Sequence, residues 1–291
     1  MIKYDLAERK DAEKISKFIA KLNKDKENHI GYCGDDAEEI QNSLMEDMDI
    51  PFEKSFIIAS ENDKIIGALG FDADMEKGNA EIWGPFIEKS GWNIAHEMWN
   101  RMMQLLPKKI KLVSMFIDKE NKNCFDLAMN LGFCKKSEEN IMIFERKYID
   151  KIDNVLPAQI TADDYEDMEQ LHDKVFPHTY YSGEDIIKRL NINRKVFIQK
   201  ENDKLEGYIY AEAEPEFGEG SIEFLAVNSF QRGRGIGYKL LCMALKWIFS
   251  FESINSVTLC VNSENNAALN LYNRAGLKEK DLLCCLTKSI D

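Results

Sequence analysis

The sequence FQRGRGIG at residues 230–237 is a glycine-rich segment with two arginines. A short apolar segment, IEFLAV at residues 222–227, precedes it and has the composition of a strand. After it, apolar residues recur with the spacing of one helix face, at Ile236, Leu240, Leu241, Ala244, Leu245 and Ile248. The glycines therefore lie where a strand is predicted to turn into a helix.

This turn has the features of a phosphate-binding site. Glycines at alternate positions, Gly233, Gly235 and Gly237, allow backbone N–H groups to face one point without obstruction by a Cβ atom. The helix N-terminus adds about half a positive charge, and Arg232 and Arg234 add two cations. We therefore expect a site for a phosphate or pyrophosphate. The alternative is a glycine turn that binds nothing.

The spacing of the glycines narrows the choice of ligand. The dinucleotide fingerprint is G-x-G-x-x-G, whereas this run reads G-x-G-x-G. The nucleoside-triphosphate loop G-x-x-x-x-G-K-[ST] does not occur in the sequence. Neither of these two nucleotide-binding motifs therefore accounts for the loop.

A second motif follows about thirty residues later. SVTLCV at residues 256–261 is β-branched and apolar, as in a strand. The next residues, 262–277, read NSENNAALNLYNRAGL, with Ala268, Leu271 and Ala275 on one helix face. Gly276 is a natural C-terminal cap for this helix.

Taken together, the two motifs resemble those of the GNAT acyltransferase superfamily. The R/Q-x-x-G-x-G/A signature matches at Arg232, Gly235 and Gly237. The second signature, V-x-x-x-N-x-x-A-x-x-L-Y-x-x-x-G-F, matches at Val261, Asn265, Ala268, Leu271, Tyr272 and Gly276. It departs only at Leu277, which replaces Phe. The resemblance covers residues from about 155 to 291.

The resemblance implies a cofactor and its binding residues. In this family the glycine loop holds the pyrophosphate of acetyl-coenzyme A, and an asparagine at the place of Asn265 faces the cofactor. The implied cofactor-binding residues are Leu225, Ala226, Val227, Arg232, Gly233, Arg234, Gly235, Ile236, Gly237 and Asn265. Transfer from the thioester to an amine is direct in this family, so no cysteine is required.

The implied chemistry needs an acid, a base and an oxyanion donor. Tyr272 stands where the family places a phenol near the coenzyme sulfur, and we expect it to be the general acid. Its alternative role is that of a packed helix tyrosine. Glu223 alternates with Leu225 and Val227 along the strand, and we expect it to take the amine proton, directly or through water. The alternative is an exposed strand carboxylate. A backbone N–H near Val227 would face the thioester carbonyl.

The acceptor site is predicted in the segment that joins two helices of the second half. In the resembled family this segment lines the acceptor pocket, and here it contains Tyr180 and Tyr181. Both are candidate acceptor contacts. The alternative is that one packs as a core aromatic residue and the other lies on the surface.

The two halves of the chain repeat each other. The sequence ENDK occurs at residues 61–64 and 201–204, and Gly67 and Gly207 keep the same offset of 140 residues. An offset of 144 residues relates Asn121 to Asn265 and Gly132 to Gly276. We interpret this as an internal duplication. The expected α/β architecture is two tandem GNAT-like domains, residues 1–150 and 151–291, each a mixed, mainly antiparallel sheet flanked by helices.

The first copy lacks the reactive part of the motifs. Residues 84–95 read GPFIEKSGWNIA, without an arginine–glycine signature, and Glu88 would oppose a phosphate. Ala128 stands at the place of Tyr272, while Phe133 retains the packing position of Leu277. We expect a degenerate copy that supports the fold and walls one side of the acceptor site. The alternative is a second, weak acyl-CoA site.

Composition excludes several other classes of protein. The 291 residues carry a formal net charge of −13, which argues against a nucleic-acid binder. The sequence has neither an apolar run near 18 residues nor a signal-peptide core, so we expect no membrane span. Seven cysteines without C-x-x-C spacing indicate reduced thiols and a cytoplasmic location. The four histidines lack metal-ligand spacing, and we expect no metal.

The sequence therefore predicts an acetyl-CoA-dependent N-acetyltransferase. Its acceptor would be a primary amine of a small molecule or a peptide N-terminus. One alternative is a non-catalytic acyl-CoA sensor, and another is a purely structural module. The chain is expected to be a monomer or a homodimer, because the apolar segment LLCCL at residues 282–286 could pair with another chain or internally.

Overall fold

The structure is a computed structural model that describes residues 1–177 and 179–290. It divides the chain into two compact units. Unit 1 comprises Met1–Glu139 and Asp281–Asp291, and unit 2 comprises Asn140–Lys280. This division differs from a boundary at residue 150, because the end of the chain belongs to unit 1 and residues 140–150 belong to unit 2.

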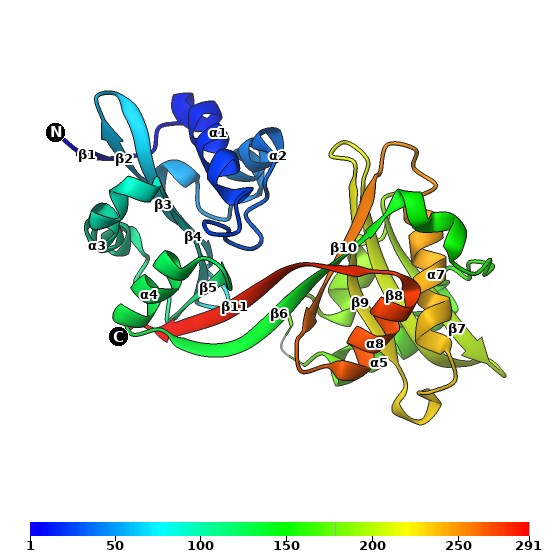
Figure 1. The fold of residues 1–291 in the computed structure, drawn as a ribbon. Helices are drawn as coiled ribbons and strands as arrows, with labels where there is room; N and C mark the ends of the chain where they lie inside the picture. The colour runs from blue at the N-terminus through cyan, green and yellow to red at the C-terminus, as the bar shows by residue number, and fades with distance from the viewer. Residues whose placement is uncertain (178, 291) are drawn as a thin grey trace. The chain divides into compact units, whose positions relative to one another are not determined.

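Unit 1 is built on a mixed sheet with the strand order β1-β2-β3-β4-β5-β11 (Figure 1). These strands are β1 (Lys3–Leu6), β2 (Ile57–Glu61), β3 (Lys64–Asp74), β4 (Asn79–Ile87), β5 (Leu112–Asp118) and β11 (Lys278–Ser289). Strands β4 and β5 are parallel, whereas β1 to β4 pair antiparallel in sequence order. The helices are α1 (Ala12–Asn23), α2 (Ala37–Asn42), α3 (Ala95–Leu105) and α4 (Lys122–Asn130).

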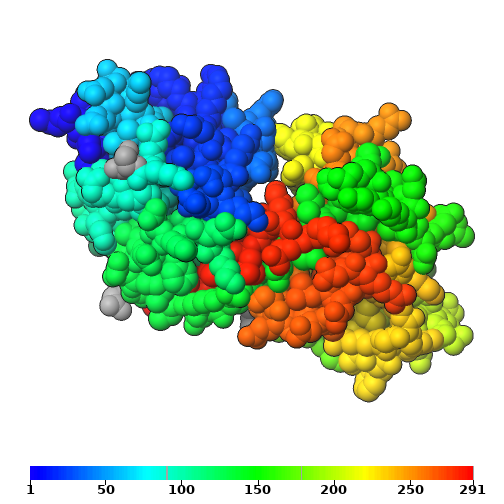
Figure 2. Space-filling view, viewed as in Figure 1, coloured from blue at the N-terminus to red at the C-terminus, as the bar shows by residue number. Residues whose placement is uncertain are grey.

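The last strand of the chain completes the sheet of unit 1. Residues Leu283 to Ser289 pair antiparallel with Asp118 to Leu112 of β5. This segment is red in Figures 1 and 2. The apolar segment at residues 282–286 therefore pairs within its own chain, which is one of the two alternatives that the sequence leaves open.

Unit 2 has the strand order β6-β10-β9-β8-β7. The strands are β6 (Cys134–Glu145), β7 (Arg194–Glu201), β8 (Lys204–Glu214), β9 (Glu219–Val227) and β10 (Ser256–Asn262). The helices are α5 (Tyr165–Val175), α6 (Gly183–Arg189), α7 (Ile236–Ile248) and α8 (Asn266–Ala275). Consecutive residues of β8 pack on opposite faces of the sheet: Ile209 lies with residues of α7, and Tyr210 lies with residues of α5 and α6. Helices therefore cover both faces of this sheet.

The two units share local geometry at the repeated sequence positions. Asn62 and Asp63 have positive φ angles of 50° and 61°, and their counterparts Asn202 and Asp203 have 50° and 60°. Asn121 and Asn265 each cap a helix by accepting a backbone N–H three residues further on. The predicted fold class, a mixed sheet flanked by helices in two tandem domains, is confirmed. Every helix in the described part of the chain is too short or too polar to cross a bilayer.

Candidate functional site

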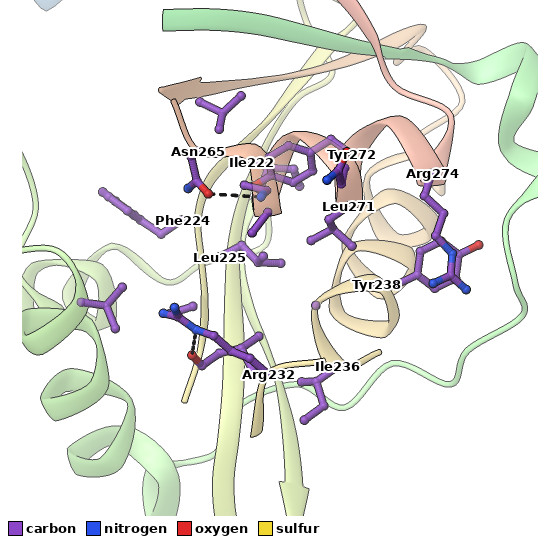
Figure 3. Close-up of a pocket in the computed structure, with 18 of the residues that line it drawn as sticks. Ile222, Phe224, Leu225, Arg232, Ile236, Tyr238, Asn265, Leu271, Tyr272 and Arg274 are labelled. Atoms are coloured by element: carbon purple, nitrogen blue, oxygen red, sulfur yellow. Dashed lines mark hydrogen bonds between the residues drawn. The ribbon is translucent and has the colours of Figure 1, made fainter. Parts of the chain in front are cut away.

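The site is a gap between two parallel strands of unit 2. β9 and β10 pair from Glu219 and Ser256 as far as Ile222 and Leu259, and both strands continue beyond this point without pairing to each other. A pocket of about 630 Å³ opens there, lined by the ends of both strands, the start of α7 and helix α8 (Figure 3). The pocket therefore lies where the sheet separates.

The edge of β9 offers backbone groups to this pocket. The Asn228 N–H donates to the Glu206 carbonyl at 2.8 Å. In the antiparallel β8–β9 pair, Asn228 and Ala226 are therefore the residues whose backbone groups bond to β8. By alternation, Leu225 and Val227 direct their N–H and C=O groups away from β8 and toward the opening. The Val227 carbonyl accepts from Arg232 Nε at 3.3 Å. The N–H groups of Leu225 and Val227 can therefore meet a ligand.

Glu223 is the extra residue of a β-bulge. Tyr210 pairs with Phe224 and Ala211 pairs with Ile222, so Glu223 has no partner in β8. A bulge of this kind re-aims a side chain. The Glu223 carboxylate accepts a hydrogen bond from the Tyr180 hydroxyl at 2.6 Å, and Glu223 lines the pocket. The structure thus brings Tyr180 and Glu223 together.

The glycine loop leaves the start of α7 open. Gly233 and Gly235 have φ angles of 80° and 81°, and an added Cβ would meet no atom within 4 Å at either position. Gly235 is the N-cap residue, and the first turn contains no acidic side chain. The first-turn N–H groups therefore have no intrahelical partner. Gly237 serves packing, since a Cβ there would lie 3.1 Å from Leu271 Cδ2 of α8.

The two loop arginines have different environments. Arg232 is exposed and lines the pocket. Arg234 does not line it, and its guanidinium pairs with Glu201 at 3.1 Å and with the buried Glu206 at 2.9 Å. These partners belong to β7 and β8, so Arg234 anchors the loop to that hairpin.

Helix α8 contributes Tyr272 and Asn265 to the pocket. Tyr272 is 7% exposed, and burial, followed by the neighbouring Cys260, raises its pKa to about 12. Its phenol therefore stays protonated at neutral pH. Asn265 Oδ1 accepts a hydrogen bond from the Ala268 N–H at 3.2 Å, which places the Asn265 amide at the N-terminus of α8 (Figure 3). Ala226 and Ile236 are buried, and both line the pocket.

The rings of Tyr180 and Tyr181 contact each other edge to face at 4.8 Å, and each ring has a further partner. The Tyr180 ring lies 4.9 Å from that of Phe224, whereas the Tyr181 ring lies beneath the Arg189 guanidinium at 4.1 Å. The Tyr181 carbonyl accepts from Nε2 of the buried His172 at 2.8 Å. Burial lowers the pKa of His172, which favours the neutral ring. His172 therefore fixes the segment that carries both tyrosines.

Several lining residues were not predicted from the sequence. Among them are Phe176, Phe224, Tyr238, Cys260, Asn262 and Arg274. The alternation of β10 could have indicated Cys260 and Asn262, since both flank the motif residue Val261. Among the described residues, no group of three or more His, Cys, Asp or Glu side chains could hold a metal ion. His178 lies outside the described residues.

Comparisons with known proteins identify the family that part of the chain matches and the fold of the whole chain. Residues 165–277 match the family model described as acetyltransferase (GNAT) family. A GCN5-related N-acetyltransferase from Sphaerobacter thermophilus is 15% identical, with a TM-score of 0.74 over 99% of this chain and 95% of that chain. A tandem GNAT protein from the clavulanic acid biosynthesis pathway is 12% identical, with a TM-score of 0.67 over 99% of this chain and 98% of that chain. No curated protein matches the sequence.

The family match begins at α5 and ends after α8. It therefore contains both strands that separate, the glycine loop and the helix that carries Tyr272. The structural likeness, at such low identity, establishes the fold of the whole chain, and the family match establishes what residues 165–277 are. Residues 165–277, which carry the pocket of unit 2, therefore match the acetyltransferase (GNAT) family.

Proposed function

We propose that this protein is an acetyl-CoA-dependent N-acetyltransferase whose active site lies in unit 2. The observation that carries the proposal is the separation of β9 and β10, which exposes the backbone groups of Leu225 and Val227 beside the protonated phenol of Tyr272. A thioester placed along this edge would have hydrogen-bond donors on one side and a proton donor on the other. The acceptor would be a primary amine.

The pocket fits the cofactor at its phosphate end. The turn at Gly233 and Gly235 has no Cβ atoms, and the first turn of α7 presents N–H groups without a capping side chain. An anion is stabilised at such a helix start. Arg232 adds a cation at the same opening. When bound, the coenzyme supplies the activated acyl group as a thioester.

The residues of unit 2 divide the chemistry among them. Glu223 would take a proton from the entering ammonium group, directly or through a water molecule, so that the free amine can attack an acyl carbon held in the pocket. The N–H of Val227 would donate to the carbonyl oxygen of the thioester as that oxygen gains negative charge. Tyr272 would give its proton to the departing sulfur, and the second proton that the nitrogen loses as the amide forms would restore the Tyr272 phenol. The products are an amide and the free thiol of coenzyme A.

Glu223 would also bind the ammonium group of the acceptor, in place of the Tyr180 hydroxyl. The Tyr180 hydroxyl donates to the Glu223 carboxylate at 2.6 Å. An ammonium group entering the site would replace this hydrogen bond with a charge-assisted one, which is stronger. Tyr180 therefore holds the carboxylate in place until an amine arrives.

The test is turnover of acetyl-CoA with a panel of primary amines and peptides. We expect release of the coenzyme thiol and an acetylated product by mass spectrometry, with both lost in Arg232→Glu. Lys239→Glu is the matched control, because Lys239 is exposed on α7 and does not line the pocket. Tight binding of acetyl-CoA without turnover across the panel would favour the sensor instead. Full activity in Arg232→Glu would contradict the proposed cofactor site.

A further inference from the structure

Arg274 is a second cation at the mouth of the pocket. It lies in the last turn of α8, its side chain is exposed, and it lines the same pocket as Arg232. Figure 3 shows Ile236, the first residue of α7, between Arg232 and Arg274. The two arginines therefore flank the open start of the helix.

The charge of the coenzyme favours a second cation at the phosphate site. Coenzyme A carries a pyrophosphate and a 3′-phosphate, and this chain has a formal net charge of −13. Arg234, which the sequence suggests for this role, is already paired with two carboxylates, one of them on the buried Glu206. Turning Arg234 toward a ligand would leave Glu206 buried without its partner, which is costly.

Arg274 has no such commitment. Among the described residues, no carboxylate forms an ion pair with it, and its guanidinium lies over the Tyr238 ring at 5.2 Å (Figure 3). A cation–π contact at an exposed site is weak. A phosphate offers the planar guanidinium two parallel hydrogen bonds. Arg274 can therefore exchange the ring for a phosphate with little loss.

We propose that Arg274, and not Arg234, is the second phosphate-binding cation of the acetyl-CoA site. The proposal rests on the proposed function, because it assigns a residue of that same site. Tyr238 positions the guanidinium beside the start of α7, and Arg274 closes the phosphate site from the side opposite Arg232.

The experiment measures the affinity of acetyl-CoA for matched variants by calorimetric titration of the full chain. Arg274→Ala should weaken binding by roughly tenfold to a hundredfold, as expected for a charge-assisted hydrogen bond. Lys239→Ala removes the same charge outside the pocket and should leave the affinity within about threefold. The double variant Arg234→Gln/Glu206→Gln removes the charge of Arg234 without leaving a buried carboxylate unpaired, and it should weaken binding less than Arg274→Ala does.

Two further ligands show whether the loss concerns a phosphate. The loss in Arg274→Ala should disappear with S-acetylpantetheine, which has no phosphate. With 3′-dephospho-CoA, a loss that persists assigns Arg274 to the pyrophosphate, and one that disappears assigns it to the 3′-phosphate. Either result supports phosphate binding.

The outcomes separate this inference from the proposed function. If the wild type does not bind acetyl-CoA, the proposed function itself fails. If the wild type binds and Arg274→Ala binds equally well, the assignment of Arg274 is wrong. A loss in the Arg234/Glu206 double variant alone would return the role to Arg234, and an equal loss with S-acetylpantetheine would show an effect unrelated to phosphate.

Discussion

Units 1 and 2 each contain a gap between two parallel strands, and another segment of the chain fills this gap in unit 1. In unit 1, β4 and β5 pair as far as Glu81 and Ser114 and then separate. There the Gly31 N–H donates to the Phe116 carbonyl at 2.8 Å, and Ile30 forms a bridge with Ile117. The segment after α1 therefore occupies the free edge of β5. In unit 2, the corresponding edge of β10 lines the pocket.

The facing strand differs as well. The Glu88 N–H donates to the Ile66 carbonyl at 3.2 Å, just as the Asn228 N–H donates to the Glu206 carbonyl in unit 2. The same alternate residues of β4 and β9 therefore bond to the preceding strand. Position 85 then corresponds to Leu225, whose N–H faces the pocket. Because proline has no N–H, Pro85 has nothing to offer a ligand at this place.

The helix ends complete the contrast. α3 has Glu97 in its first turn, whereas the first turn of α7 has no acidic residue. The buried Ala128 replaces the phenol of Tyr272. Unit 1 thus retains the caps and turns that stabilise the fold, but it lacks the groups that in unit 2 would contact a ligand. That unit 1 is a degenerate copy stays a prediction, supported by these three differences.

Loss of the phenol should produce the largest effect. Tyr272→Phe keeps the ring and removes the proposed proton donor, so kcat should fall by about 10²- to 10⁴-fold while the dissociation constant of acetyl-CoA stays near that of the wild type. Steady-state kinetics with calorimetry would check both. A wild-type kcat would show that Tyr272 only packs, like Ala128 in unit 1.

Removal of the carboxylate should have the next largest effect. Glu223→Gln should lower the rate about a hundredfold near neutral pH, because the amine keeps its proton. The deficit should shrink toward pH 10, where a free amine loses its proton unaided. A rate–pH profile checks this, with Tyr180→Phe as the control that removes only the hydroxyl next to Glu223. A deficit independent of pH would argue against a role as base.

A proline at residue 225 would give β9 of unit 2 the lack of an N–H that distinguishes β4 of unit 1. Leu225→Pro gives β9 the feature of Pro85 and removes an N–H that the β8 ladder does not use. We expect acetyl-CoA to bind roughly tenfold more weakly, and Leu225→Ala to show how much of this loss comes from the side chain. Equal affinities of the two variants would mean that this N–H does not contact the coenzyme.

The smallest predicted effect concerns the stability of unit 1. Burial, followed by the nearby Asp72, raises the pKa of Glu81 to about 8. A carboxyl whose pKa is raised on folding stabilises the fold most below its usual value of 4.5, and the contribution is lost as pH rises through 8. Between pH 7 and 8 the free energy of unfolding should fall by about 1 kcal/mol from this group.

Urea unfolding at several pH values would measure this slope. Glu81→Gln should flatten it, because the amide does not titrate. Residue 221 of unit 2, at the offset of 140 residues, is a serine and adds no such dependence. An unchanged slope in Glu81→Gln would place the pH dependence elsewhere.

The sequence predicted the fold class, the loop at the start of α7 and the helix of Tyr272, because local signals specify them. The alternating glycines and the Asn265 cap act over a few residues, and their consequences appear in the structure. The ion pairs of Arg234 could not be predicted, since Glu201 and Glu206 come from a distant hairpin. The role of β11 in unit 1 was not predicted for the same reason, because its partner strand lies far back in the sequence.

The placement of β11 has a consequence for synthesis on the ribosome. Unit 1 emerges first, but its strand β5 lacks its antiparallel neighbour until residues 283–289 have been made, after all of unit 2. Through that interval β5 is an uncovered sheet edge, which can pair with other chains. The nascent protein therefore completes its first unit last, and a ribosome that stalls within unit 2 would release a chain whose first unit lacks that strand.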